Sequence, residues 1–207
     1  WLTLSGVLAM EIFGMLRHYW EGMVLWVLTL AAWPVVHSFT VLLHELAHLS
    51  VAVALGSKIR AFTAGPFEFW DNGKGRRQTR VDWSRTLSGG GLVAAEPRSL
   101  SNARWDFALI NIAGPVVSLG SGALLLLLFW NFPWPDSEAL RRVVGFAAID
   151  GLITCLMTLV PVQGNDGHSF LHLVLNTAQG RDYVDAIRIG TQLQETYSDS
   201  AAELESL

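Results

Sequence analysis

Two histidines and one glutamate stand out as residues that could do chemistry together. They lie in the run VLLHELAHL, residues 41–49, as His44, Glu45 and His48, in the pattern H-E-x-x-H. On a helix, side chains four positions apart project from one face, so both imidazoles could bind one metal ion. Glu45 would then lie beside that ion, where a carboxylate can take a proton from a bound water. The spacing therefore predicts a zinc site of the hydrolytic kind.

The sequence around this motif is apolar. Between Met23 and Gly56, Glu45 is the only Asp, Glu, Lys or Arg residue. Ionisable groups at membrane depth cost free energy and usually mark a functional site. The alternative is a chance match on a buried helix, with both histidines hydrogen-bonded in the core. His37, seven residues before His44, shares its helix face and is expected to be a hydrogen-bonded structural histidine.

Composition places the chain among membrane proteins. Of its 207 residues, 51% are hydrophobic and only 15% are charged, whereas soluble domains carry about a quarter charged residues. We expect an all-α polytopic membrane protein, a bundle of about four transmembrane helices with a small β-containing cytoplasmic insertion after the zinc-binding helix. The net charge of −4 and the lack of a basic face argue against nucleic acid as a partner. Cys155 is the only cysteine, which excludes a disulfide or a cysteine zinc site within the chain.

Turns and prolines divide the apolar sequence. The apolar segments are residues 1–16, 23–56, 107–130 and 143–162. Residues 17–22 are typical of a turn at a membrane boundary. Pro34 is expected to kink or break the helix, with a short approach segment before it and a helix near 35–56 after it. Residues 1–34 could form one span, two spans or an interfacial segment.

The polar blocks suggest a domain plan. A transmembrane domain is expected over residues 1–180, with a polar, partly β insertion at 57–106, and an acidic tail over 181–207. Strands are predicted at 59–64 and 66–70 around a Gly65-Pro66 turn, followed by a solvated turn over 71–80. The insertion holds nine Lys and Arg residues, so insertion and tail are expected in the cytoplasm, in a bacterial-type cell membrane.

A catalytic zinc site needs a third protein ligand. Asp166 and Asp150 are the candidates, and each is followed by glycine. Both aspartates could reach mid-membrane, so their depth does not distinguish them.

His44–His48 together with LVPVQGNDG, residues 159–167, resembles the site-2 protease family of intramembrane zinc metalloproteases. That family pairs an H-E-x-x-H helix with a later Pro…Asp-Gly motif whose aspartate binds zinc, so the resemblance implies Asp166 as the third ligand. Gly114-Pro115 resembles the family's Gly-Pro-x-x-Asn element, with Ser118 in the asparagine position. The pieces at 64–66 and 90–91 resemble its short sheet insertion.

The resemblance implies a zinc metalloendopeptidase that hydrolyses peptide bonds of membrane-embedded or membrane-proximal substrates. Glu45 would activate a zinc-bound water at a single Zn²⁺ held by His44, His48 and Asp166. Further substrate contacts are expected from Gly90, Gly91, Asn111, Asn165 and His168. The expected partners are a membrane protein or peptide substrate and the lipid bilayer.

Two other functions stay open: a non-proteolytic zinc-binding membrane scaffold of the same fold, and a membrane zinc hydrolase of small peptides or lipids. Glu45 argues against the scaffold, because a structural zinc site needs no base.

Overall fold

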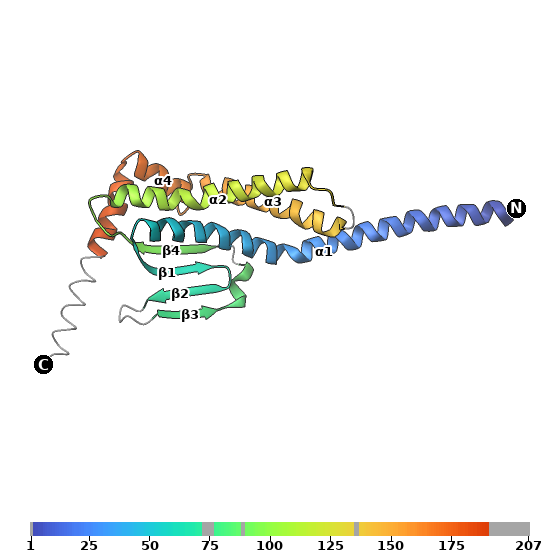
Figure 1. Ribbon diagram of the computed structural model, residues 1–207, viewed down its shortest axis with the longest axis horizontal. Helices are drawn as coiled ribbons and strands as arrows, with labels where there is room; N and C mark the ends of the chain where they lie inside the picture. The colour runs from blue at the N-terminus through green and yellow to red at the C-terminus, as the bar shows by residue number, and fades with distance from the viewer. Residues whose placement is uncertain (1, 72–76, 88–89, 135–136, 191–207) are drawn as a thin grey trace.

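A computed structural model describes residues 2–71, 77–87, 90–134 and 137–190 (Figure 1). The chain forms helix α1, a four-stranded sheet and then three further helices. The elements are α1 (Leu2–Ala54), β1 (Lys58–Ala64), β2 (Phe67–Asp71), β3 (Arg77–Val81), the 3₁₀ helix η1 (Trp83–Leu87), β4 (Gly91–Glu96), α2 (Ala103–Asn131), α3 (Glu138–Leu159) and α4 (Asp166–Val174). Residues 178–190 are also helical.

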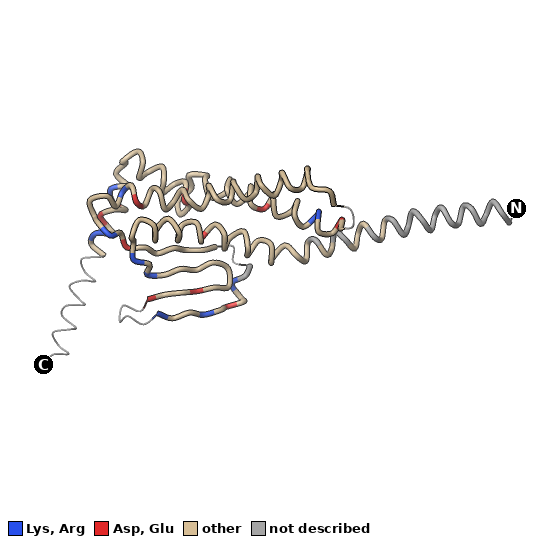
Figure 2. Tube along the Cα trace, viewed as in Figure 1, with Lys and Arg blue, Asp and Glu red and all other residues tan. Residues whose placement is uncertain are grey.

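Three segments in the described part of the chain are long and apolar enough to cross a membrane. They are Leu30–Ala54 within α1, the whole of α2 and the whole of α3. Figure 2 shows that Lys and Arg residues gather at the ends of the helical body, and that most of its length is uncharged. These helices indicate an integral membrane protein. The sequence predicted about four spans over the whole chain, and three candidates lie in the residues that the structure describes. The nine residues of α4 are too few to cross a ~30 Å hydrocarbon layer.

Helix α1 is continuous over 53 residues, and Pro34 lies inside it. The predicted break at Pro34 and the predicted turn at 17–22 are therefore both wrong. Proline removes one helical hydrogen bond, but membrane helices tolerate it where neighbouring groups compensate. The N-terminal part of α1 extends away from the other elements, as Figure 1 shows.

Small residues bring the helices together around the motif. Helix α2 contacts α1, α3 and α4. A Cβ atom added at Gly151 of α3 would lie only 3.2 Å from the Cα atom of Gly122 on α2, so these two backbones nearly touch. Between the motif and the C-terminal end of α1, a buried cluster that includes Ala52, Phe107 and Leu173 joins α1, α2 and α4. The bundle therefore holds the motif helix against two other helices.

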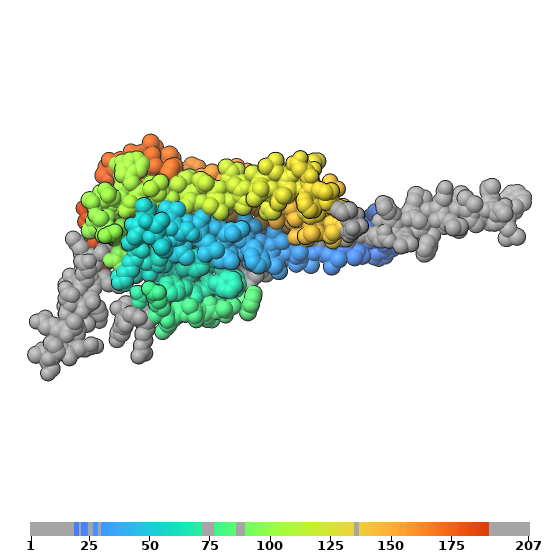
Figure 3. Space-filling view, viewed as in Figure 1, coloured from blue at the N-terminus to red at the C-terminus, as the bar shows by residue number. Residues whose placement is uncertain are grey.

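The sheet lies along one side of α1 and packs against it, opposite the other helices (Figures 1 and 3). Its order is β3-β2-β1-β4, and all pairs are antiparallel. Strand β1 begins just after α1 ends and runs back along it, until Gly65 lies against Ser38. β4 is thus an edge strand beside the middle of the candidate span.

Two strands of the sheet were predicted. β1 and β2 confirm the strands expected at 59–64 and 66–70, and Gly65 has the positive φ of +54° that the turn between them needs. The solvated turn expected over 71–80 is wrong at its end, because β3 begins at Arg77. The composition of β3 is polar, and its pairing with β2 forms the strand despite that composition.

Candidate metal centre

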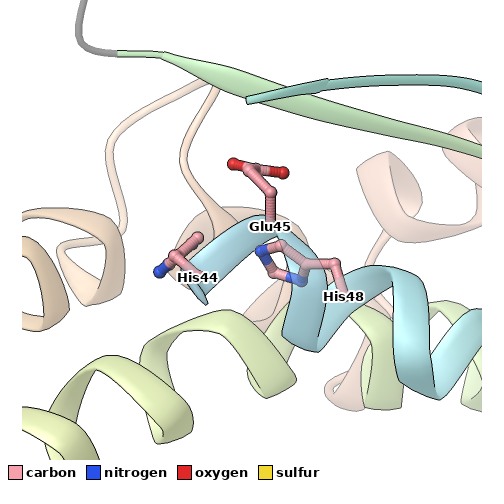
Figure 4. A group of neighbouring side chains, drawn as sticks. All are labelled: His44, Glu45 and His48. Atoms are coloured by element: carbon pink, nitrogen blue, oxygen red, sulfur yellow. The ribbon is translucent and has the colours of Figure 1, made fainter. Parts of the chain in front are cut away.

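The H-E-x-x-H residues form one buried group on α1. The exposed fractions of His44, Glu45 and His48 are 3%, 7% and 4%. Their ligand atoms all lie within 4.8 Å of one another. In Figure 4, Glu45 projects toward the strands and away from the two imidazoles. The helix therefore presents the two imidazoles on one side and the Glu45 carboxylate on another.

Helix α2 fixes both imidazoles through their Nδ1 atoms. His48 Nδ1 donates to the Ile110 carbonyl oxygen at 2.5 Å. His44 Nδ1 lies 2.8 Å from the Ser118 hydroxyl oxygen, which is buried and can accept its proton. Because each Nδ1 has a partner, each Nε2 is the free ring nitrogen, and this arrangement is the usual one for histidines that bind metal.

Asp166 faces both free nitrogens from the start of α4. One of its oxygens, Oδ2, lies 3.0 Å from His44 Nε2 and 3.5 Å from His48 Nε2. A carboxylate oxygen at this position can act as a metal ligand.

This donor set fits a tetrahedral zinc ion. If Nδ1 carries the proton in each ring, two nitrogen lone pairs point at one carboxylate oxygen, and a cation between them would bind all three atoms. Ligands about 2.0–2.1 Å from a tetrahedral ion are about 3.3 Å apart, close to the nitrogen–oxygen separations here. His44, His48 and Asp166 can therefore hold one Zn²⁺ and leave its fourth position open.

Gly114 keeps the metal position clear. A Cβ atom added to this residue of α2 would overlap Nε2 of both His44 and His48. The helix backbone can approach the imidazoles this closely only because the side chain is absent. Gly114 is buried and is followed by Pro115 inside the helix.

Glu45 lies under the edge of the sheet. A Cβ atom added at Gly91, the first residue of β4, would overlap the Glu45 side chain. A cleft of ≈ 170 Å³ opens at this point, with helix α3 contributing Thr154 and Thr158. The residues lining it include His44, Glu45, Gly90, Gly91, Asn165 and Asp166. The cleft thus joins the ligand groups, the carboxylate and the strand edge.

Of the other predicted contact residues, Asn165 lines the cleft, whereas His168 and Asn111 do not. The Asn165 amide donates to the carbonyl oxygens of Met157 and Val160, at 2.7 and 3.3 Å, and so fixes the link between α3 and α4. His168 does not line the cleft, and its ring packs against His172 with centroids 4.3 Å apart. Asn111 Nδ2 is buried, and within the described residues it has no hydrogen-bond partner.

Asp150, the other candidate ligand, contacts a different histidine. Its Oδ1 atom lies 3.2 Å from Nδ1 of His37, and Trp33 donates to the same oxygen at 3.4 Å. The Trp33 and His37 rings are stacked, with centroids 5.5 Å apart. Asp150 therefore links α3 to α1 about two helical turns away from His44.

Sequence reasoning did not find the groups that orient the imidazoles. The Ile110 carbonyl carries no side-chain signal at all. Ser118 was noted only as a departure from a family pattern, although its spacing of four from Gly114 places both on one helix face. That shared face was the available signal.

Comparison with known proteins identifies the family of the chain. A family model described as Peptidase family M50 matches residues 34–137, which include the motif on α1 and the Gly114-Pro115 pair. The chain belongs to this family, the site-2 protease family, and is a membrane metalloprotease by family. Neither a curated protein nor a solved structure matches the chain.

Proposed function

We propose that this chain is an intramembrane zinc endopeptidase that cleaves membrane-embedded or membrane-proximal peptide substrates. The observation that carries the proposal is the position of Glu45, which is buried beside a three-ligand site and opens on a cleft at a strand edge. A structural zinc site would close its fourth position and need no such carboxylate. The motif lies near the middle of the candidate span Leu30–Ala54, so the reaction would take place at membrane depth.

His44, His48 and Asp166 would hold the zinc ion. When bound, the ion lowers the pKa of a water molecule and polarises the scissile carbonyl. Glu45 accepts the proton of the attacking water as its oxygen bonds to the carbonyl carbon. Glu45 then gives that proton to the leaving amine as the C–N bond breaks. The close approach of Gly91 holds the Glu45 side chain in place for both transfers.

Strand β4 offers a way to hold the substrate. The peptide bonds of a membrane helix are covered by its own hydrogen bonds, so a substrate has to unwind before attack. β4 is an edge strand and begins at the cleft, so an extended peptide could pair with it and reach Glu45. The absence of side chains at Gly90 and Gly91 leaves room for another backbone.

A pair of proline substitutions tests this pairing. Leu92 and Val93 alternate in direction, so the N–H of one faces β1 and the N–H of the other faces away. Of the variants Leu92→Pro and Val93→Pro, the one that removes the N–H facing away from β1 should keep the fold and lower cleavage. The variant that removes the N–H facing β1 should weaken the sheet. Full cleavage by a folded outward variant would exclude the pairing.

The central experiment compares wild type with Glu45→Gln on candidate membrane substrates while bound zinc is measured. Cleavage should fall about 10²–10⁴-fold with the metal retained, because a proton acceptor is lost but no ligand is. Cleavage unchanged by the substitution would contradict the proposal. Glu45-dependent hydrolysis of short soluble peptides, with no cleavage of any membrane substrate, would favour the small-substrate hydrolase.

We also propose that residues 57–106 and the tail face the cytoplasm. The support is the excess of Lys and Arg in this insertion. A cysteine introduced at exposed Ser101, which follows β4 at the end of the sheet where α1 ends, with Cys155 replaced by serine, should react with a membrane-impermeant reagent only from the cytoplasmic side. Labelling from the opposite side would reverse the orientation.

A further inference from the structure

A second cleft lies between the end of α1 and the inner face of the sheet, away from the metal centre. It measures ≈ 470 Å³ and draws residues from α1, β1, β2 and β3. Its apolar walls are Leu49, Val53, Ile59, Phe62 and Phe69. Its polar lining is Ser57, Lys58, Asp71 and Arg77. None of these residues belongs to the metal centre.

The polar groups of this cleft carry a positive charge that is not neutralised. Lys58 and Arg77 are exposed, and neither is paired with a carboxylate among the described residues. Asp71 shares Arg60 with Glu96, because Arg60 lies 3.7 Å from Asp71 and also pairs with Glu96. Together with Lys58 and Arg77, these three residues leave one net positive charge at the cleft. The cleft therefore attracts an anion through two cationic side chains.

Ser57 adds an unused hydrogen-bond donor. This residue is only 9% exposed, and its hydroxyl oxygen is buried with no partner among the described residues. A buried polar group without a partner costs free energy, unless a ligand or water completes it. Ser57 lines the cleft, so a rotation of its side chain would bring the hydroxyl to a bound anion, which would supply the missing partner.

The order of these groups along the membrane direction identifies the ligand. Leu49 and Val53 lie in the last turns of the candidate span, which ends at Ala54, whereas Ser57 and Lys58 follow it. A phospholipid has the same order, an acyl chain in the hydrocarbon layer and a phosphate just outside it. A soluble phosphate would leave the five apolar residues of the cleft without a partner.

We propose that this cleft binds one anionic phospholipid, with the acyl chain along Leu49 and Val53 and the phosphate between Ser57, Lys58 and Arg77. Such a lipid would contact the end of α1 and three strands of the sheet. The edge strand β4 of the same sheet lies at the metal centre. The proposal concerns lipid binding alone and does not depend on the proposed peptidase activity.

Native mass spectrometry of the full chain can test it, with phosphatidylglycerol and phosphatidylcholine of identical acyl chains as probes. Wild type should retain phosphatidylglycerol in preference. Lys58→Gln/Arg77→Gln should reduce that retention about tenfold, because both cations that attract the phosphate are lost. Ser57→Ala should reduce it about threefold, as expected for one lost hydrogen bond.

Arg80→Gln/Arg188→Gln is the matched control, since it removes the same charge from two exposed arginines outside the cleft. This control should retain the lipid like wild type. Equal retention of both lipids by wild type, unchanged retention in Lys58→Gln/Arg77→Gln, or an equal loss in the control would overturn the proposal. So would displacement of the lipid by an equal concentration of soluble glycerophosphoglycerol, because the apolar walls would then contribute nothing.

Discussion

Two histidine–aspartate contacts lie on the same helix, two turns apart, and differ in what surrounds them. At the metal centre, His44 and His48 each have Nδ1 paired with a group on α2 and present Nε2 to Asp166. At the second contact, a single imidazole presents Nδ1 to Asp150, which also accepts from Trp33.

The difference teaches what makes a polar cluster in a membrane helix bundle a site. The Asp150 cluster pairs its donors and acceptors internally, so it needs no additional ion and serves to join α1 to α3. The Asp166 cluster directs two imidazole nitrogens and one carboxylate oxygen at one point, a donor set that a cation can complete. The side chains of His44 and His48 are 4% and 6% exposed against 21% for His37, whereas Asp166 is more exposed than Asp150, so donor geometry and not burial alone distinguishes the two clusters.

The largest effect should come from filling the metal position. Gly114→Ala places a methyl group against both Nε2 atoms, within the space that bonds of about 2.0 Å to zinc require. We expect bound zinc to fall close to zero by elemental analysis. Gly120→Ala is the control, because a Cβ atom at Gly120 has no neighbour within 4 Å. Normal zinc content in Gly114→Ala would show that the ion does not lie where we place it.

A smaller effect should follow from releasing one imidazole. Ser118→Ala removes the partner of His44 Nδ1, and loss of such a partner lowers metal affinity about 10–100-fold. A chelator-competition titration measures this affinity. Ser121→Ala is the matched control, because its hydroxyl donates only to the Ser118 carbonyl and does not touch a histidine. Equal affinities in the two variants would remove the positioning role of Ser118.

The smallest effect is expected at the second cluster. A double-mutant cycle with His37→Ala and Asp150→Ala should give a coupling of about 1 kcal/mol in the free energy of unfolding, typical of a polar contact between membrane helices. Detergent-induced unfolding provides the measurement. Zinc content should match wild type in all three variants. Loss of zinc from the His37→Ala variant would join the two clusters into one functional unit.

The metal-binding helix was predictable because its signal is local. The i, i+4 spacing places His44 and His48 on one face whatever surrounds them, and a single charge in a long apolar run marks the depth. The turn at Gly65-Pro66 was predictable for the same reason, since glycine and proline act on their own backbone.

Features that depend on tertiary contacts were not predictable in this way. Pro34 is a strong local signal for a helix break, yet α1 continues through it. A break inside the membrane would expose backbone carbonyls where no water can form hydrogen bonds with them. The sequence limited the third ligand to Asp150 or Asp166, but only the packing of α3 on α1 shows that Asp150 meets His37. The role of Ile110 as an acceptor belongs to a backbone atom and has no sequence signature.

Zinc stoichiometry in Asp166→Asn and Asp150→Asn, measured side by side on folded full-length protein, tests the central claim most directly. The account predicts that Asp166→Asn loses the ion, because its Oδ2 atom faces both imidazoles, and that Asp150→Asn keeps one zinc per chain. Retention of zinc by Asp166→Asn, together with its loss from Asp150→Asn, would contradict the account.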